Sequence, residues 1–130
     1  MVEEILNVVT NPCSEIILRP NQFCNLTEVM VRSSDTLEDL KNKVRLATIL
    51  GTYQSTLTDF KYLRKRWQLN TEEERLLGVS LTGIMDSLLT NGKAYKDVES
   101  GLKETLTTLK NVAIETNKEM ADKLGINVSA

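Results

Sequence analysis

Three polar side chains of different chemistry occupy alternate positions near the N-terminus. They are the amide of Asn11, the thiol of Cys13 and the carboxylate of Glu15, and a second thiol, Cys24, follows eleven residues after the first. In an extended segment, side chains at alternate positions point to one face, roughly 6.5–7 Å apart along the strand. Pro12 favours this conformation because its ring fixes its own φ and keeps the preceding residue out of the helical region. We therefore expect an amide, a sulfur and an acid to act together on one side of a stiffened loop.

The bulk composition is that of an ordinary globular domain. A chain of 130 residues with 41% hydrophobic and 26% charged residues suits a single domain. The net charge of −2 argues against a nucleic-acid-binding domain, which is usually strongly basic. No run approaches the roughly 18 consecutive apolar residues that span a bilayer, and the acidic start lacks the positive region of a signal peptide. We expect a cytoplasmic protein with no membrane or nucleic-acid partner.

The residue types also exclude several kinds of site. With two cysteines and no histidine, the chain alone cannot supply the four Cys or His ligands of a structural zinc site. No Ser-His or Cys-His couple can form within it either. We expect no metal site.

The basic and aromatic residues of segment 61–67 invite a nucleic-acid interpretation, because cationic and aromatic side chains together bind backbone and stack bases. Their spacing instead indicates the solvated end of a helix, where cations complement the helix dipole.

Short extended runs dominate the first part of the chain. The apolar residues at 5–9 predict a strand or an extended arm, and those at 16–18 predict a short buried strand that ends at the break 19–21. A second extended run covers 26–31. Its alternation of apolar and polar residues is blurred, which leaves burial on both faces open.

Helical periodicity dominates the remainder. Asp35 or Ser34 is the expected N-cap of a first helix, with Glu38 reaching back in a capping box. The period then predicts one long helix, or two in series, from about 36 to 66. Further elements are expected in this order: a short helix beginning at 70, an interior strand at 76–81, a short helix at 82–89, and a long amphipathic helix at 94–124 closed by Gly125.

Four motifs together resemble ribonucleotide reductases. They are Asn11-Pro12-Cys13-x-Glu15, Cys24-Asn25-Leu26-x-Glu28-Val29, the segment 50–58 (LGTYQSTLT) and the segment 74–86 (ERLLGVSLTGIMD). The eleven-residue gap between the cysteines is similar to the adenosylcobalamin-dependent ribonucleoside-triphosphate reductases of class II. The resemblance covers most of residues 8–90.

The resemblance implies a fold. In that family the catalytic domain is a ten-stranded α/β barrel with a finger loop through its centre. We therefore expect a helix-rich α/β structure that forms one partial segment of this barrel over residues 1–130. Within it, residues 1–33 would hold the finger loop and strands, 34–92 helices and an interior strand, and 93–130 the long C-terminal helix.

The resemblance also implies roles for four residues. Cys13 would become a thiyl radical that abstracts the 3′ hydrogen of the ribose, and Glu15 would act as general base on the 3′ hydroxyl. Asn11 would hydrogen-bond the ribose hydroxyls and hold the sugar in place. Cys24 would be one of two thiols that reduce the 2′ position and end as a disulfide.

The implied cofactor is adenosylcobalamin, and a diiron or glycyl-radical partner remains an alternative radical source. The implied substrate is a ribonucleoside tri- or diphosphate, reduced to a deoxyribonucleotide for DNA synthesis, with a thioredoxin-like or dithiol reductant.

The chain lacks several parts of that family. The partner thiol of Cys24, the other barrel strands and the C-terminal thiol pair have no counterpart here. We therefore expect the 130-residue chain to be inactive alone and to need the missing reductase segments as partners. The alternatives are a subunit of a split reductase, and a helical interaction module that kept the loop by descent.

Overall fold

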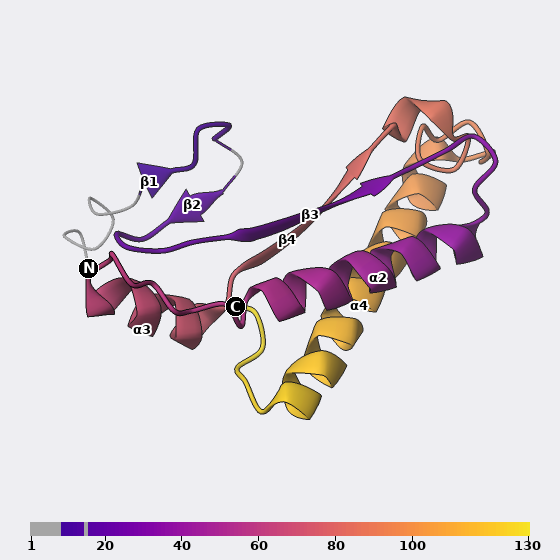
Figure 1. Cartoon of the computed structure of the whole chain (residues 1–130). Helices are drawn as coiled ribbons and strands as arrows, with labels where there is room; N and C mark the ends of the chain where they lie inside the picture. Colours follow the sequence, from indigo (N-terminus) through magenta and orange to yellow (C-terminus); the bar gives the residue numbers. More distant parts are fainter. Residues whose placement is uncertain (1–8, 15) are drawn as a thin grey trace.

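The structure is a computed structural model that describes residues 9–14 and 16–130 (Figure 1). Its elements, in chain order, are β1 Val9–Thr10, β2 Ile17–Leu18, β3 Asn25–Met30, α2 Leu37–Gln54, α3 Lys65–Glu74, β4 Leu77–Thr82, the 3-10 helix η1 Ile84–Asp86 and α4 Val98–Leu124. Of the strand or extended arm expected at 5–9, only Val9 lies among the described residues, and it is the first residue of β1.

Strands β3 and β4 form a parallel pair. They run in register from Asn25 opposite Leu77 to Met30 opposite Thr82. A parallel pair needs a crossover connection, and α2 provides it by packing against both strands. The core lies between the sheet and the two long helices, and its buried members are Val29, Val31, Leu40, Val44, Ala47 and Leu109.

The two faces of this sheet differ. Val29 is buried against α2, whereas Leu26 and Met30, on the opposite face, are 53% and 56% exposed. The sequence left open whether this strand is buried on both faces. The structure shows that only one face is buried. The face away from the helices, which carries Leu26, Glu28 and Met30, is called the open face below.

The first long helix begins one residue later than expected. Thr36 is the N-cap, and its hydroxyl accepts from the backbone N–H of Asp39, whose carboxylate accepts from the backbone N–H of Thr36. A capping box is therefore present, as predicted, but it is formed by Thr36 and Asp39. The predicted cap residues, Asp35 or Ser34 with Glu38, are wrong. Asp35 instead accepts from the backbone N–H of Arg32 at 2.9 Å and from Lys43 Nζ at 2.5 Å.

Helix α2 runs through Gly51 and ends at Gln54, so the helix expected from 36 to 66 is interrupted by the loop 55–64. A β-carbon at Gly51 would lie 2.2 Å from Leu77 Cδ1. The glycine therefore lets α2 lie close to β4. The buried Ser55 ends the helix by donating its hydroxyl to the carbonyl of Thr52 at 2.6 Å.

Helix α3 has the reverse charge polarity of the expected arrangement. Lys65 and Arg66 stand in its first turn and residues 72–74 in its last. The prediction that a helix starts at residue 70 is therefore wrong. The prediction that the cations lie at the end of a helix, where they would complement its dipole, is wrong as well. Hydrogen bonds stabilise the acid at this end of the helix. The carboxylate of Glu72 accepts from the side chains of Gln68 and Thr58, each at 2.8 Å. The bond from Gln68, followed by that from Thr58, lowers the pKa of Glu72.

The helix expected at 82–89 is only the short η1. Gly83 precedes it at φ 73°, and a β-carbon there would lie 2.5 Å from the carbonyl oxygen of Val31. The chain therefore turns sharply beside the end of β3 and does not continue as a helix.

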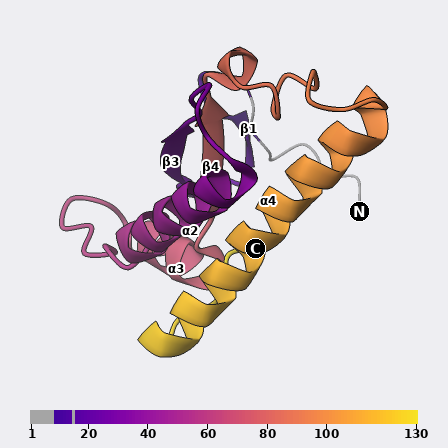
Figure 2. The same ribbon diagram turned by 90° about the vertical axis from the view of Figure 1, so that its right-hand side faces the viewer.

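The long final helix is confirmed as α4, but it begins at Val98 and not at residue 94. It ends at Leu124, as expected, with Gly125 as a left-handed C-cap. It lies diagonally against α2 (Figure 2). Buried Asn117 joins three parts of the chain, because its Nδ2 donates to Thr52 Oγ1 at 3.0 Å and its Oδ1 accepts from the backbone N–H of Ser129 at 2.9 Å. None of the described helices is long and apolar enough to cross a membrane.

We predict that Asn117→Ala lowers the free energy of unfolding by about 1–3 kcal/mol, because it removes the bond to Thr52 and leaves the Ser129 N–H without its acceptor. Urea unfolding measures this. Asn111→Ala, at an exposed position of the same helix, is the matched control, since both changes gain the same helix propensity. Equal stability of the two variants would contradict the assigned role of Asn117.

A second prediction concerns acid. The Lys43 ammonium, and then the Arg32 N–H, hold the pKa of Asp35 below its ordinary value of 3.8. The ionised carboxylate therefore stabilises the fold above that value, and this contribution is lost as the pH falls through the lowered pKa. Asp35→Asn should be less stable than the natural chain at neutral pH, and the gap should close in strong acid. Urea unfolding across the acid range tests this, with Asp122→Asn, an exposed change on α4, as the control. A gap that persists unchanged in strong acid would contradict it.

Candidate active site

The segment with the alternating polar residues forms the tip of a β-hairpin. Strands β1 and β2 pair antiparallel, Val9 opposite Leu18 and Thr10 opposite Ile17. At the tip, the backbone N–H of Ser14 donates to the carbonyl of Asn11 at 3.0 Å, which closes a turn over Pro12 and Cys13. Cys13 thus sits at the end of a projecting loop, and it is exposed.

The tip is a turn, so the expectation of an extended segment is wrong for residues 11–14. Ser14 has φ 65°, in the left-handed region. Pro12 suits a turn as well as a strand, because its fixed φ matches the second position of a β-turn. The relative positions of the Asn11 and Cys13 side chains are therefore set by a turn, and not by the alternation of side chains along a strand. Glu15 lies outside the described residues, and its position relative to Cys13 stays untested.

Asn11 helps to hold the tip closed. Its side-chain Oδ1 accepts from the backbone N–H of Ile16 at 3.2 Å, and its own backbone N–H donates to the carbonyl of Ile16 at 3.3 Å. Ile17, expected in a buried strand, is in a strand but is 72% exposed. The hairpin therefore projects with little apolar packing around Ile17.

The second thiol lies at the sheet. Cys24 directly precedes β3 and is half-buried. It lies two residues before Leu26, so along an extended chain the two side chains belong to the same face. A β-carbon at Gly78 would lie 3.7 Å from the Sγ of Cys24. Cys24 therefore lies over the start of the open face, where Gly78 leaves room for it. The structure holds both cysteines as thiols.

The hairpin and Cys24 share one side of the molecule. Figure 1 shows the hairpin near the start of β3, on the side of the sheet away from α2. The helices fill the other face. The two thiols are therefore both outside the core formed by the sheet and the helices.

Sequence reasoning missed the residues that hold the base of the hairpin. Gln22 is 7% exposed, and its amide donates to the carboxylate of Glu74 from across 52 residues of sequence. A pairing between such distant positions leaves no local pattern.

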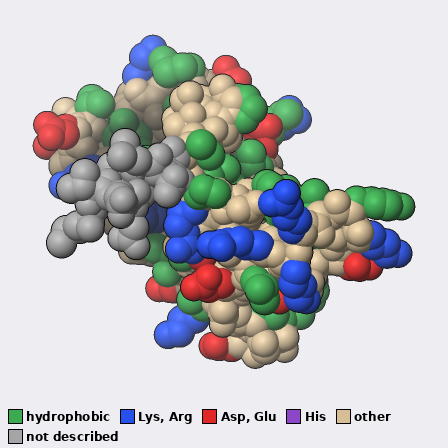
Figure 3. Space-filling view, turned by 90° about the vertical axis from the view of Figure 1, so that its left-hand side faces the viewer, with side chains coloured by type: hydrophobic (Ala, Val, Ile, Leu, Met, Phe, Trp, Pro, Cys, Tyr) green, Lys and Arg blue, Asp and Glu red, His purple; other side chains and the backbone are tan. Residues whose placement is uncertain are grey.

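The basic segment 61–67 combines exposed and packed aromatic residues, and Tyr62 is 98% exposed. Trp67 packs its ring on Phe23 with centroids 4.8 Å apart, so this aromatic residue serves the fold. On the side of the molecule shown in Figure 3, Lys and Arg side chains lie among acidic and hydrophobic ones. Among the described residues, no cluster of His, Cys, Asp or Glu could hold a metal ion.

Known proteins match the chain over nearly all of its length. The family model described as "Ribonucleotide reductase, barrel domain" matches residues 4–129. The adenosylcobalamin-dependent ribonucleoside-triphosphate reductase of Lactobacillus acidophilus is 31% identical, over 92% of this chain and 18% of the relative. The enzyme of the same name from Lactobacillus helveticus is 29% identical, with the same coverage of 92% and 18%. No solved structure matches the chain.

The chain therefore spans about 18% of the length of these curated relatives. The resemblance that the four motifs predicted is confirmed, and so is the helix-rich α/β segment expected from it. This chain belongs to the family of the ribonucleotide reductase barrel domain.

Proposed function

We propose that this chain supplies the radical-bearing hairpin of a ribonucleotide reductase, an enzyme that converts ribonucleotides to 2′-deoxyribonucleotides for DNA synthesis. The observation that carries the proposal is Cys13, an exposed thiol at the tip of a proline-containing turn. Relatives named as ribonucleoside-triphosphate reductases support it, because they align over 92% of the chain.

In this proposal Cys13, as a thiyl radical, takes the 3′ hydrogen atom of the ribose. An S–H bond forms as the C3′–H bond breaks, and the two bonds are close enough in strength for the transfer to run both ways. Glu15 takes the proton of the 3′ hydroxyl, a task suited to a carboxylate in hydrogen-bond reach. Asn11 holds the ribose hydroxyls, which lowers the entropic cost of the reaction.

Reduction at the 2′ carbon then uses Cys24. Together with a second thiol from another reductase segment, it gives two electrons and two protons and becomes half of a disulfide, while the 2′ oxygen leaves as water. A dithiol or thioredoxin-like reductant restores the thiols by exchange. The place of Cys24 at the start of the open face supports this role, since the helices occupy the other face.

The cofactor we propose is adenosylcobalamin, as in the names of the relatives. When bound, it would supply a radical that can take the hydrogen atom of a thiol. The fit of this chain to such a group rests on Cys13, whose exposed position allows a large molecule to approach it. The contribution of this chain is the thiol and its support, and we assign the binding of the cofactor to other segments.

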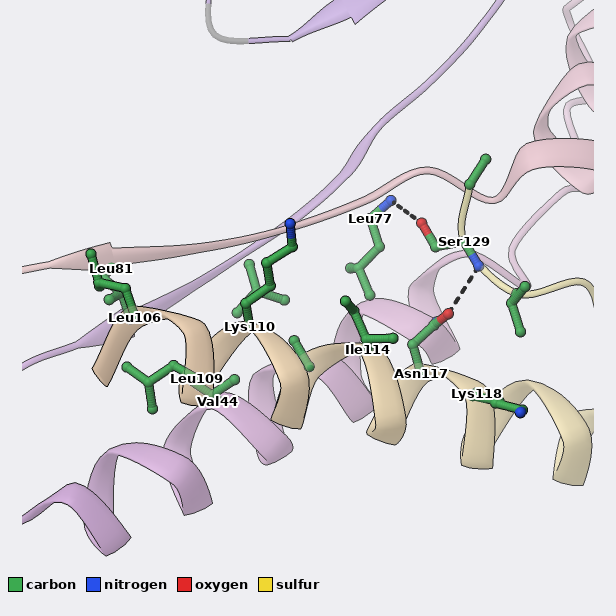
Figure 4. Close-up of a pocket in the computed structure, with 14 residues that line it drawn as sticks. Val44, Leu77, Leu81, Leu106, Leu109, Lys110, Ile114, Asn117, Lys118 and Ser129 are labelled. Atoms are coloured by element: carbon green, nitrogen blue, oxygen red, sulfur yellow. Dashed lines mark hydrogen bonds between the residues drawn. The ribbon is translucent and has the colours of Figure 1, made fainter. Parts of the chain in front are cut away.

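Those other segments have a surface to cover. A cavity of about 750 Å³ lies between β4 and α4, lined by Leu77, Val79 and Leu81 on the strand and by Leu106 and Ile114 on the helix (Figure 4). Ile114 is 55% exposed. In the described sheet β4 pairs only with β3, so its other edge is open, and open strand edges recruit further strands.

The last two residues contact the start of β4. Ser129 Oγ accepts from the backbone N–H of Leu77 at 3.0 Å, and the backbone N–H of Ala130 donates to the carbonyl of Glu74 at 3.0 Å. Residues 129–130 thus lie at the start of β4. The open edge of β4 beside the apolar cavity supports a further reductase strand that pairs with β4 and covers the cavity.

A second apolar surface lies on the opposite flank. Leu46, Leu50 and Tyr53 recur at helical spacing on α2 and are 62%, 66% and 50% exposed. Apolar surface on both flanks supports a segment that is enclosed by neighbours on each side.

We predict that the chain restores nucleotide reduction to a Lactobacillus acidophilus reductase from which the aligned segment has been removed. With adenosylcobalamin and a dithiol present, formation of deoxyribonucleotide should require the chain and be abolished by Cys13→Ala. Chromatography of the nucleotides measures both.

Ser14→Gly, next to Cys13 at the same exposed tip, is the control and should keep activity, because glycine tolerates the left-handed φ of 65° at this position. Turnover with Cys13→Ala would contradict the radical assignment. Binding without turnover, for the natural chain and for the variant alike, would instead identify an interaction module.

A further inference from the structure

The position of Cys13 depends on a short stem. The hairpin consists of two strands of 2 residues each, and Val9 and Ile17 are 57% and 72% exposed. With so little apolar burial, packing of these strands cannot fix the hairpin. Within the described ranges, the link between the hairpin and the sheet is made by residues 19–23, which connect β2 to Cys24 and are called the stem below.

Glu74, the last residue of α3, binds the stem at two points. One carboxylate oxygen accepts from the guanidinium of Arg19, and the other accepts from the side-chain amide of Gln22. Gln22 in turn accepts from the backbone N–H of Arg19 at 2.5 Å. The three residues close a ring through two side-chain bonds to Glu74 and one bond from the backbone of Arg19, and Gln22 is buried in it.

Asn70 holds the turn of the stem from the preceding turn of α3. Its side-chain amide donates to the carbonyls of Pro20 and Asn21, at 3.1 and 3.3 Å. Asn21 has φ 64°, so the backbone bends sharply at this point. The two carbonyls at the bend are thus held by one amide.

An aromatic cluster completes the attachment. The ring of Phe23 lies 5.0 Å from that of Phe60 and 4.8 Å from that of Trp67, between centroids. Phe23 directly precedes Cys24. One end of the stem is therefore fixed by rings and the other by the carboxylate of Glu74.

Glu74 is itself anchored to the sheet. Its carbonyl accepts from the backbone N–H of Ala130 at 3.0 Å, and β4 begins three residues later at Leu77. Arg75, between them, is left-handed at φ 44° and donates to the carbonyl of Ser55 at 2.6 Å. The carboxylate thus projects from a fixed point beside the strand that lies next to Cys24.

We infer that Glu74 is a positioning residue that fixes where the Cys13 thiol stands relative to the Cys24 thiol. It acts through Arg19 and Gln22 and touches neither sulfur. The catalytic meaning of this placement rests on the proposed function, in which both thiols work on one ribose. The geometric claim does not depend on turnover.

The two native cysteines allow a direct test, because the chain has no others. Nitroxide labels on Cys13 and Cys24 report the distance between hairpin and sheet by pulsed electron paramagnetic resonance. We expect one narrow distance distribution for the natural sequence and a distribution broadened about twofold or more for Glu74→Ala, as the stem loosens. Glu74→Gln, which keeps one acceptor of the same length, should be intermediate. The control is Glu119→Ala, which removes a carboxylate bound to Arg45 and Lys123, away from the stem. This variant should leave the distribution narrow.

A second label pair separates a loosened stem from a loosened fold. In a Cys13→Ser background, labels on Cys24 and on Leu106→Cys, an exposed position of α4, report distances within the body. This distribution should stay narrow in Glu74→Ala. The inference is overturned if the Cys13–Cys24 distance distribution has the same width in Glu74→Ala as in the natural sequence, whether that width is narrow or broad. It is also overturned if the distribution of the second label pair broadens in Glu74→Ala. Because no nucleotide is needed, a failure here is distinct from a failure to restore nucleotide reduction.

Discussion

The parallel pairing of β3 with β4 is the constraint on which the rest of the structure depends. Two parallel strands cannot be joined by a tight turn, so the chain must cross over, and α2 covers one face of the pair as it does so. Val29, Leu40 and Val44 bury that face. The other face is left to Cys24, Leu26 and Glu28, and the hairpin stands on the same side. One-sided burial thus separates a packing side from a side that is open to chemistry.

The surfaces that stay exposed agree with this division. The edge of β4 and the cavity above α4 expose apolar side chains beside an open strand edge, and the exposed stripe on α2 presents apolar side chains elsewhere. The family match over residues 4–129, set against 18% of the relatives' length, points in the same direction. In the part of the chain that the structure describes, the hairpin is held differently, by the polar and aromatic contacts of its stem.

Local patterns predicted the strands 26–31 and 76–81, the long final helix and the cysteine motif, since periodicity and motif spacing are readable along the chain. They failed where distant contacts decide. The charges around α3 predicted the opposite helix polarity, and tertiary partners such as Thr58 and Phe23 outweigh the dipole there. Pro12 is compatible with a strand and with a turn, and the left-handed Ser14 selects the turn. The contact of Gln22 with Glu74 spans 52 residues and leaves no sequence signal.

The central claim is that the sulfur of Cys13 takes a hydrogen atom from the ribose. The most direct test compares an ordinary ribonucleotide with one carrying deuterium at the 3′ carbon, in the reductase completed with this chain. If the sulfur of Cys13 takes this hydrogen atom, turnover of the deuterated nucleotide should be slower, and neither nucleotide should be turned over after Cys13→Ser. Equal rates for the two nucleotides, or an isotope effect that survives Cys13→Ser, would contradict it.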